Sequence, residues 1–187
     1  MRIVSGIFKG KKLYQPKDEF TRPLKDLTKE SLFNIIVHSN KFNGKIKDAN
    51  ILDLFSGIGS FGLECLSREA RTVTFVENYK IVTSILRKNI SNLNLSEKSK
   101  VIEKDIFKAL DFNNLDNKFD IIFLDPPYKE KNLSIILEKI FDAKILSKEG
   151  IIVVHRHKNE PNETNEFFNI IEEKNYGISK LIFGNFF

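Results

Sequence analysis

Short apolar segments alternate with amphipathic segments over residues 49–187, and this alternation restricts the fold more than any other feature of the sequence. Apolar segments without an exposed face are typical of strands that are buried on both sides. They occur at 51–55, 72–77, 100–103, 119–124 and 150–155. Segments with apolar residues three or four positions apart predict helices at about 60–68, 78–93 and 133–140. This order predicts an α/β fold, a parallel sheet with helices on both faces.

The end of the chain adds two more strand-prone segments, at 167–171 and 180–183, which flank a turn at Tyr176 and Gly177. With the five earlier strands they predict a seven-stranded, mostly parallel sheet.

Composition restricts the cellular setting. The single cysteine excludes an internal disulfide, and no apolar stretch reaches the roughly 18 residues that a membrane span needs. The first residues lack the apolar run of a signal peptide. We therefore expect a soluble cytoplasmic protein.

The first 47 residues differ from the rest in charge. They contain eleven Lys and Arg against four Asp and Glu, a balance of +7, whereas the whole chain carries +5. Strand-prone segments at 3–8 and 11–14 predict a hairpin, and Pro23 can begin a helix. A basic segment on a near-neutral body indicates polyanion binding, although a generally lysine-rich composition is an alternative explanation. We expect 1–47 to form a basic extension and 48–187 the main domain.

Acidic residues lie at the carboxyl ends of four predicted strands: Asp53, Glu77, Asp105 and Asp125. In open α/β sheets, ligands bind beyond the carboxyl ends of the strands, near the point where the strand order reverses. A single acid at such a position is commonly a helix cap or a solvated loop residue. Four acids at successive strand ends are difficult to explain by capping alone, so we expect a binding site lined with negative charge.

A glycine-rich turn follows the first of these strands. Gly57 and Gly59 let the backbone approach a ligand, and Gly62 allows close packing of the following helix. The spacing also fits a dinucleotide site or an ordinary strand–helix turn. Asp53, just before the turn, would repel a pyrophosphate but attract an ammonium or sulfonium group, which favours S-adenosylmethionine. Glu77 is then placed to accept hydrogen bonds from the ribose hydroxyls.

The fourth strand ends in Asp125, Pro126, Pro127 and Tyr128. The Asp125 side chain and the Pro126 carbonyl can accept hydrogen bonds from the exocyclic amine of a base, and neither proline has a competing N–H. Tyr128 offers a ring for stacking on the base. Taken alone, the tetrapeptide also fits a proline turn capped by aspartate. Beside the strand-end acids it favours a site that holds a base amine.

These motifs make the chain resemble the bacterial class I methyltransferases that modify the N2 amine of a guanine in 16S ribosomal RNA. The resemblance covers nearly the whole length, through SGIFKGKKL at 5–13, TRP at 21–23, LFN at 32–34, DLFSGIGSFG at 53–62, FVE at 75–77 and LDPPY at 124–128. The tetrapeptide DPPY is shared with adenine-N6 and cytosine-N4 enzymes. The basic opening and the TRP and LFN segments are what favour the guanine-N2 family over those enzymes. Ile58, Leu27 and His155 depart from the family pattern.

The resemblance implies S-adenosylmethionine as cofactor, S-adenosylhomocysteine as product, and a Rossmann-like methyltransferase domain over 48–187. It implies catalytic roles for Asp125, Pro126, Pro127 and Tyr128. It implies cofactor contacts by Arg22, Asp53, Phe55, Gly57, Gly59, Glu77, Asn78, Asp105, Ile106 and Asp125. RNA phosphates would be contacted by Arg2, Lys9, Lys11, Lys12 and Lys25. The implied partner is small-subunit ribosomal RNA or the assembling small subunit, with no metal, no membrane and no need for an oligomer.

Three other interpretations remain open. A DNA adenine-N6 or cytosine-N4 methyltransferase would normally carry a separate target-recognition region, for which 187 residues leave little room. A catalytically silent RNA-binding module would not need the tetrapeptide or the acids. A nucleotide-dependent dehydrogenase would have no use for Asp53 or the tetrapeptide. Arg22 is explained equally well as a surface residue at the start of a helix.

Overall fold

The structure is a computed structural model, and it describes residues 1–16, 26–42, 44–115, 118–127, 132–161 and 165–187. Its helices are α1 (Asp26–His38), α2 (Ser60–Ser67), α3 (Lys80–Asn92) and α4 (Leu133–Asp142), with short 3-10 turns at Ser96–Lys98 and Phe112–Asn114. Its strands are β1 (Asn50–Leu54), β2 (Thr72–Val76), β3 (Ser99–Ile102), β4 (Phe119–Leu124), β5 (Leu146–His157), β6 (Phe168–Tyr176) and β7 (Ser179–Phe186). The predicted start of the first helix, at Pro23, lies outside the described residues.

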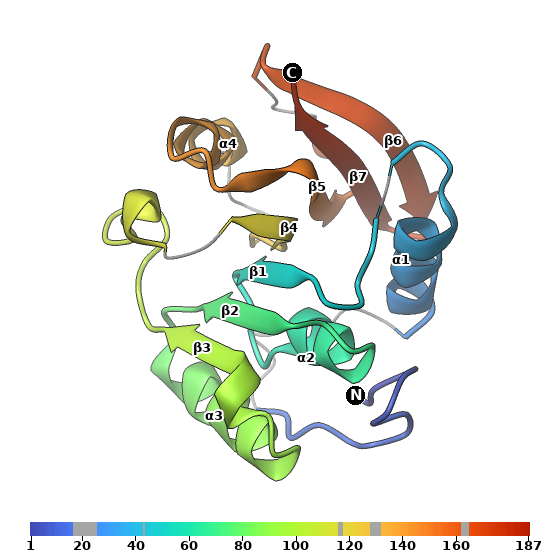
Figure 1. The fold of residues 1–187 in the computed structure, drawn as a ribbon, viewed down its shortest axis with the longest axis vertical. Helices are drawn as coiled ribbons and strands as arrows, with labels where there is room; N and C mark the ends of the chain where they lie inside the picture. Colours follow the sequence, from blue (N-terminus) through green and yellow to red (C-terminus); the bar gives the residue numbers. More distant parts are fainter. Residues whose placement is uncertain (17–25, 43, 116–117, 128–131, 162–164) are drawn as a thin grey trace.

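The strands of the described residues form one seven-stranded sheet in the order β3-β2-β1-β4-β5-β7-β6 (Figure 1). Neighbours from β3 to β5 pair in parallel, whereas β7 pairs antiparallel with both β5 and β6. The sheet is therefore mixed, and the prediction of a mostly parallel sheet holds only for β1 to β5. The cause is the tight turn at Gly177, since a connection that short can join only antiparallel strands.

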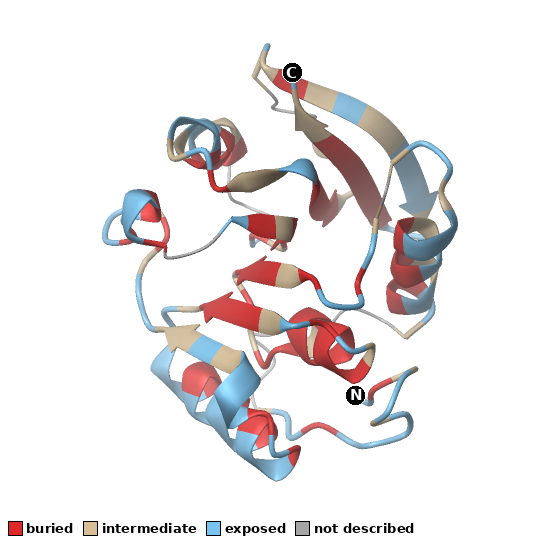
Figure 2. Cartoon of the chain, in the orientation of Figure 1, coloured by how far each residue is buried: buried red, intermediate tan, exposed pale blue. Residues whose placement is uncertain are grey.

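Helices cover both faces of the sheet, as predicted (Figure 1). One face packs against α1, α2, α3 and the N-terminal segment, and it receives Ile51, Val73, Phe123 and Val153 from the strands. The opposite face packs against α4 and the segment around Leu110. Both layers are continuously buried along the central strands (Figure 2). Burial on both sides explains why these strands are apolar throughout.

An aromatic stack fixes the position of the residues that follow β4. The Phe61 ring on α2 stacks on Phe123 of β4 with ring centroids 4.1 Å apart, and on Phe33 of α1 at 5.3 Å. These rings join two helices to the sheet two residues before Asp125. Stacked rings in a close-packed core leave little freedom for movement, so the end of β4 is rigidly placed.

The N-terminal hairpin predicted from the sequence is present but short: Arg2 and Lys12 form an antiparallel bridge, the Ile3 N–H donates to the Lys11 carbonyl at 3.0 Å, and the Leu13 N–H donates to the Met1 carbonyl at 3.1 Å. The reason is competition for backbone hydrogen bonds. The N–H groups of Val4 and Ser5 donate to the Glu64 carboxylate on α2, at 2.8 and 2.9 Å, instead of to a second strand. The segment therefore runs along α2 as a loop anchored by a buried side chain.

Glu64 also contacts a buried cation. The Nζ of Lys29 lies 3.8 Å from Glu64 Oε2, both side chains are fully buried, and Nζ donates to the Arg2 carbonyl at 2.6 Å. Burial lowers the pKa of Lys29, while the charge of Glu64 acts in the opposite direction. One of the eleven N-terminal cations thus belongs to the core and not to a basic surface.

Candidate active site

The strand order places the four acids along one edge of the sheet. Asp105, Glu77, Asp53 and Asp125 stand at or just beyond the carboxyl ends of β3, β2, β1 and β4, which are neighbours in that order. The chain proceeds outward from β1 through β2 to β3 and then returns to the other side of β1 at β4. The order therefore reverses between β1 and β4, where ligands bind in folds of this type. Asp53 and Asp125 flank that point.

Asp53 is almost fully buried, and its carboxylate serves the start of the next helix. The Gly62 N–H in the first turn of α2 donates to Asp53 Oδ2 at 3.0 Å. Burial raises the pKa of Asp53 well above its ordinary value; the Gly62 bond opposes the rise, and the nearby carboxylates of Asp125 and Glu77 add to it. A cation beside this carboxylate would relieve an unfavourable buried charge.

Glu77 holds the glycine turn against the start of α3. Its Oε2 accepts from the Gly57 N–H at 2.9 Å, and its Oε1 accepts from the N–H groups of Asn78 and Tyr79 at 2.9 and 3.0 Å. The N-cap of α3 is Tyr79, and no side chain caps the helix from that position. Glu77 satisfies the unpaired N–H groups there instead.

The glycine turn has the backbone conformation and the space that a ligand site needs. Gly57 has φ +54°, and a Cβ there would meet no atom within 4 Å. Gly59, with φ +84°, is the N-cap of α2. Phe55 has φ +59°, a conformation that is costly for a bulky residue and is common at functional sites. In contrast, the Ile58 side chain is buried and packs in the core.

The segment after β3 lies at the end of the row of four acids that is farthest from β4. Asp105 Oδ1 accepts from the N–H groups of Phe107 and Lys108 at 2.9 and 3.0 Å, which makes a tight turn. The Asn78 amide donates to Asp105 Oδ2 at 3.4 Å. Ile106 is buried in the core on the α4 side. The structure therefore brings Asn78 and Asp105 together at this end of the sheet.

Asp125 has a partner that sequence reasoning missed. Its Oδ1 lies 2.8 Å from Nδ1 of His155, and Nε2 of that histidine lies 2.9 Å from the Ser179 hydroxyl. Pro126 is buried and Pro127 is exposed. The sequence singled out His155 only as a departure from the family. The register of the two parallel strands explains the contact, since Leu124 pairs with Val154 and Asp125 and His155 are the next residues on each strand's path.

Three predicted site residues, Arg22, Lys25 and Tyr128, lie outside the described residues. The other predicted RNA contacts, Arg2, Lys9, Lys11 and Lys12, are exposed on the N-terminal loop. Arg2 also bonds Asp26 at 3.2 Å. The loop reaches the glycine turn through Asn89 of α3, whose amide nitrogen donates to the carbonyls of both Tyr14 and Ile58 at 3.2 Å.

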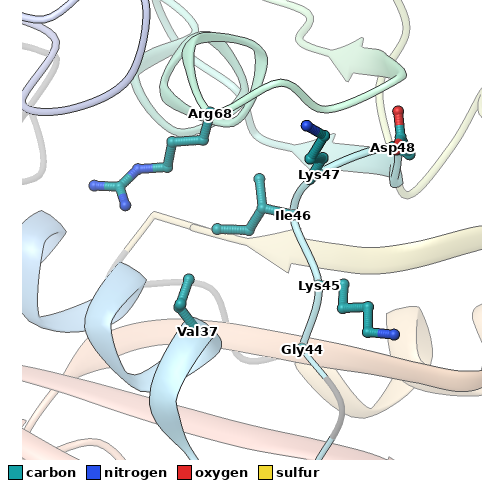
Figure 3. A pocket seen from close by; sticks show the side chains of 7 residues that line it. All are labelled: Val37, Gly44, Lys45, Ile46, Lys47, Asp48 and Arg68. Carbon is teal, nitrogen blue, oxygen red and sulfur yellow. The ribbon is translucent and has the colours of Figure 1, made fainter.

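A surface hollow of about 480 Å³ lies elsewhere, at the amino end of β1. It is lined by Val37, Gly44, Lys45, Ile46, Lys47, Asp48 and Arg68 (Figure 3). The Nε of Arg68 donates a hydrogen bond to the Glu64 carboxylate at 3.1 Å, and its guanidinium lies over the Phe33 ring at 4.3 Å from the centroid. This hollow is at the opposite edge of the sheet from the four acids, so it is not part of the candidate site.

Three further observations bear on function. Cys65 is fully buried, and burial raises the pKa of its thiol well above the ordinary value, which suits a core residue and not a nucleophile. Within the described ranges, no three His, Cys, Asp or Glu side chains are grouped so that they could hold a metal ion. No helix among the described residues is long and apolar enough to cross a membrane.

Known proteins share this architecture and sequence. The family model described as Conserved hypothetical protein 95 matches residues 1–185. The chain is 35% identical over 179 residues to the Haemophilus influenzae protein named ribosomal RNA small subunit methyltransferase D, covering 95% of this chain and 90% of that protein. The chain therefore belongs to the Conserved hypothetical protein 95 family, as the match over residues 1–185 shows.

Solved structures agree at the level of the fold. A putative methyltransferase from Escherichia coli superposes with a TM-score of 0.82 and 28% identity, over 100% of this chain and 97% of the other. A more distant RNA methyltransferase from Salinibacter ruber, solved with S-adenosyl-L-homocysteine, gives a TM-score of 0.62 at 13% identity, covering 87% of this chain and 92% of that one. The predicted class I methyltransferase fold is thereby confirmed, with the mixed sheet as its correction.

Proposed function

We propose that the protein transfers a methyl group from S-adenosylmethionine to the N2 amine of a guanine in 16S ribosomal RNA. The observation that carries this proposal is the position of Asp125 and the Pro126 carbonyl directly beyond β4, across the switch point from Asp53. The name of the Haemophilus influenzae relative supports an rRNA substrate. The choice of guanine N2 rests on the sequence resemblance.

The described residues fit the cofactor. The open space beside Gly57 admits a ligand against the backbone, and the acids along the edge match a molecule with an ammonium, a sulfonium and ribose hydroxyls. When bound, S-adenosylmethionine supplies a methyl group on a positively charged sulfur, which becomes a neutral thioether as the methyl leaves. Glu77 and Asp105 would hold its ribose and adenine, and Asp53 would face its positively charged end.

The residues after β4 orient the amine that receives the methyl group. An aromatic amine is a weak nucleophile because its lone pair is delocalised into the ring. Hydrogen bonds from its N–H groups to Asp125 and the Pro126 carbonyl would direct the lone pair toward the methyl carbon. As the new N–C bond forms, the nitrogen loses one proton to solvent. Positioning and preorganised dipoles supply most of the rate gain.

The basic N-terminal loop supplies the expected contact surface for RNA. Lys9, Lys11 and Lys12 are exposed on the loop that α2 anchors, and Tyr128, by its place after the prolines, would stack on the base. Contacts to phosphates release bound counterions, so RNA affinity should fall steeply as salt rises. Small-subunit rRNA or the assembling small subunit is the proposed partner, and the cytoplasm is the proposed compartment.

Asp125→Ala tests the proposal. Methyl transfer to unmodified 16S rRNA should fall about 100-fold or more, the usual loss when a preorganised electrostatic partner is removed. Single-turnover rates with labelled S-adenosylmethionine measure it, and circular dichroism checks the fold. Asp142→Ala, an exposed aspartate at the end of α4, is the matched control. Wild-type turnover in Asp125→Ala would refute the assignment, and transfer to duplex DNA in place of rRNA would support a DNA amine methyltransferase.

A further inference from the structure

We propose that His155 is a positioning residue, which fixes one carboxylate oxygen of Asp125 so that the other oxygen receives the substrate amine. The inference rests on the proposed function and deepens it. No sequence motif of the family assigns this histidine a role. The argument comes from a chain of two hydrogen bonds that crosses three strands, β4, β5 and β7, at the rim of the candidate site.

The geometry of this chain is tight at both ends. The distances are 2.8 Å from His155 Nδ1 to Asp125 Oδ1 and 2.9 Å from Nε2 to Ser179 Oγ. His155 is only 5% exposed, and Ser179 is 9% exposed. The carboxylate of Asp125 keeps 27% of its side-chain surface exposed. The Ser179 end of this pair of hydrogen bonds is therefore buried in the sheet, and the Asp125 end faces the space where substrate would bind.

The partners determine the roles of the two ring nitrogens. A carboxylate only accepts hydrogen bonds, so Nδ1 must carry the hydrogen. In a neutral imidazole, Nε2 is then an acceptor, and the Ser179 hydroxyl donates to it. The direction of donation thus runs from Ser179 through His155 to Asp125. This arrangement selects one tautomer and one orientation of the ring.

The two carboxylate oxygens of Asp125 therefore have different roles. Oδ1 is occupied by His155, which leaves Oδ2 to accept from the base amine. Without the imidazole, the carboxylate could rotate about its side-chain bonds, and an orientation error of about 1 Å can cost up to roughly 100-fold in rate. The sheet itself does not depend on the imidazole, because backbone pairing joins Val154 to Ile182 and His155 to Leu181.

Matched substitutions separate positioning from general structural effects. His155→Asn keeps an N–H donor near the place of Nδ1, whereas His155→Leu removes it. We expect His155→Leu to lower the single-turnover rate roughly 10- to 100-fold, with little change in S-adenosylmethionine affinity, and His155→Asn to restore much of that loss. His157→Leu, two residues along the same strand, is the control. Equal rates for His155→Leu and wild type would overturn the proposal, as would equal losses in the Leu and Asn variants.

Double substitution tests whether the histidine acts through Asp125. If it does, adding His155→Leu to Asp125→Ala should lower the rate no further, because the positioned group is already absent. Independent, multiplicative losses would show that His155 acts by another route. Thermal unfolding of each variant identifies any loss that comes from a damaged fold.

One readout does not depend on activity. Nitrogen-15 NMR of the histidine side chains should show His155 with its hydrogen on Nδ1 in the wild type, and its signal should shift in Asp125→Ala. A hydrogen on Nε2 in the wild type would overturn the positioning role even in an active enzyme. If the wild-type protein transferred no methyl group to rRNA but showed the predicted tautomer, the proposed function would fail while the His155–Asp125 bond stood.

Discussion

At the residue scale, the four strand-end acids differ in what they hold: Asp53, Glu77 and Asp105 accept from backbone N–H groups, whereas Asp125 bonds the His155 side chain. Their common edge could be predicted from the sequence, since consecutive parallel strands end on the same side of a sheet. Their hydrogen bonds could not. The first three lie next to turns whose N–H groups lack backbone partners, so Glu77 accepts from the Gly57 N–H and Asp105 from the Phe107 N–H. Each carboxylate oxygen can accept more than one hydrogen bond, so helix capping and ligand binding, which the sequence presents as alternatives, can use the same side chain.

Asp53 gives this view a measurable consequence. Its pKa is raised in the folded state, so protonation stabilises the fold; that contribution is complete below the ordinary value of 3.8 and is lost as pH rises through the folded pKa. Asp53→Asn keeps an acceptor for the Gly62 N–H and cannot ionise. The stability of this variant relative to wild type should therefore increase as pH rises above about 4.

Urea unfolding of both proteins from about pH 3 to pH 8 measures the difference. Glu173→Gln, on an exposed part of β6, controls for the general effect of removing a carboxylate. A difference between Asp53→Asn and wild type that stays constant across this range would contradict the raised pKa.

At the element scale, α1 and the N-terminal loop are joined to α2 by the buried pair of Lys29 and Glu64. Charge counting placed Lys29 in the basic extension. Its spacing from Phe33 and Ile36, four and seven residues on, is the signal that it shares the buried face of α1. The predicted hairpin is shorter than expected for a related reason. A side chain on a distant helix took the backbone donors of Val4 and Ser5, and local strand propensity cannot reveal such a partner.

Substitutions in this pair should show the cost of an unpaired buried charge. Glu64→Gln leaves Lys29 buried without its carboxylate and should lower the free energy of unfolding by about 3 kcal/mol. The double variant Lys29→Met with Glu64→Gln removes both charges and should recover part of that loss. Chemical denaturation at neutral pH measures both. A double variant that is less stable than Glu64→Gln alone would show that the ion pair does not explain the effect.

At the scale of the whole molecule, the order of the strands brings the site together. The five parallel strands and their helices could be predicted from hydrophobic pattern and spacing, because burial on both faces leaves a clear signal. The antiparallel direction of β7 was set by a turn at Gly177, and the contact of His155 with Asp125 by a pairing between strands 30 residues apart. Such long-range partners become visible only when the sheet is assembled.

The most direct test of the central claim is to map the methyl group itself. The protein is incubated with labelled S-adenosylmethionine and unmodified small-subunit rRNA or particles, and the modified nucleotide is identified by mass spectrometry. The proposed function predicts a single methyl group on the exocyclic N2 of one guanine. Label on a ring atom, on adenine or cytosine, or in no RNA at all would contradict the account.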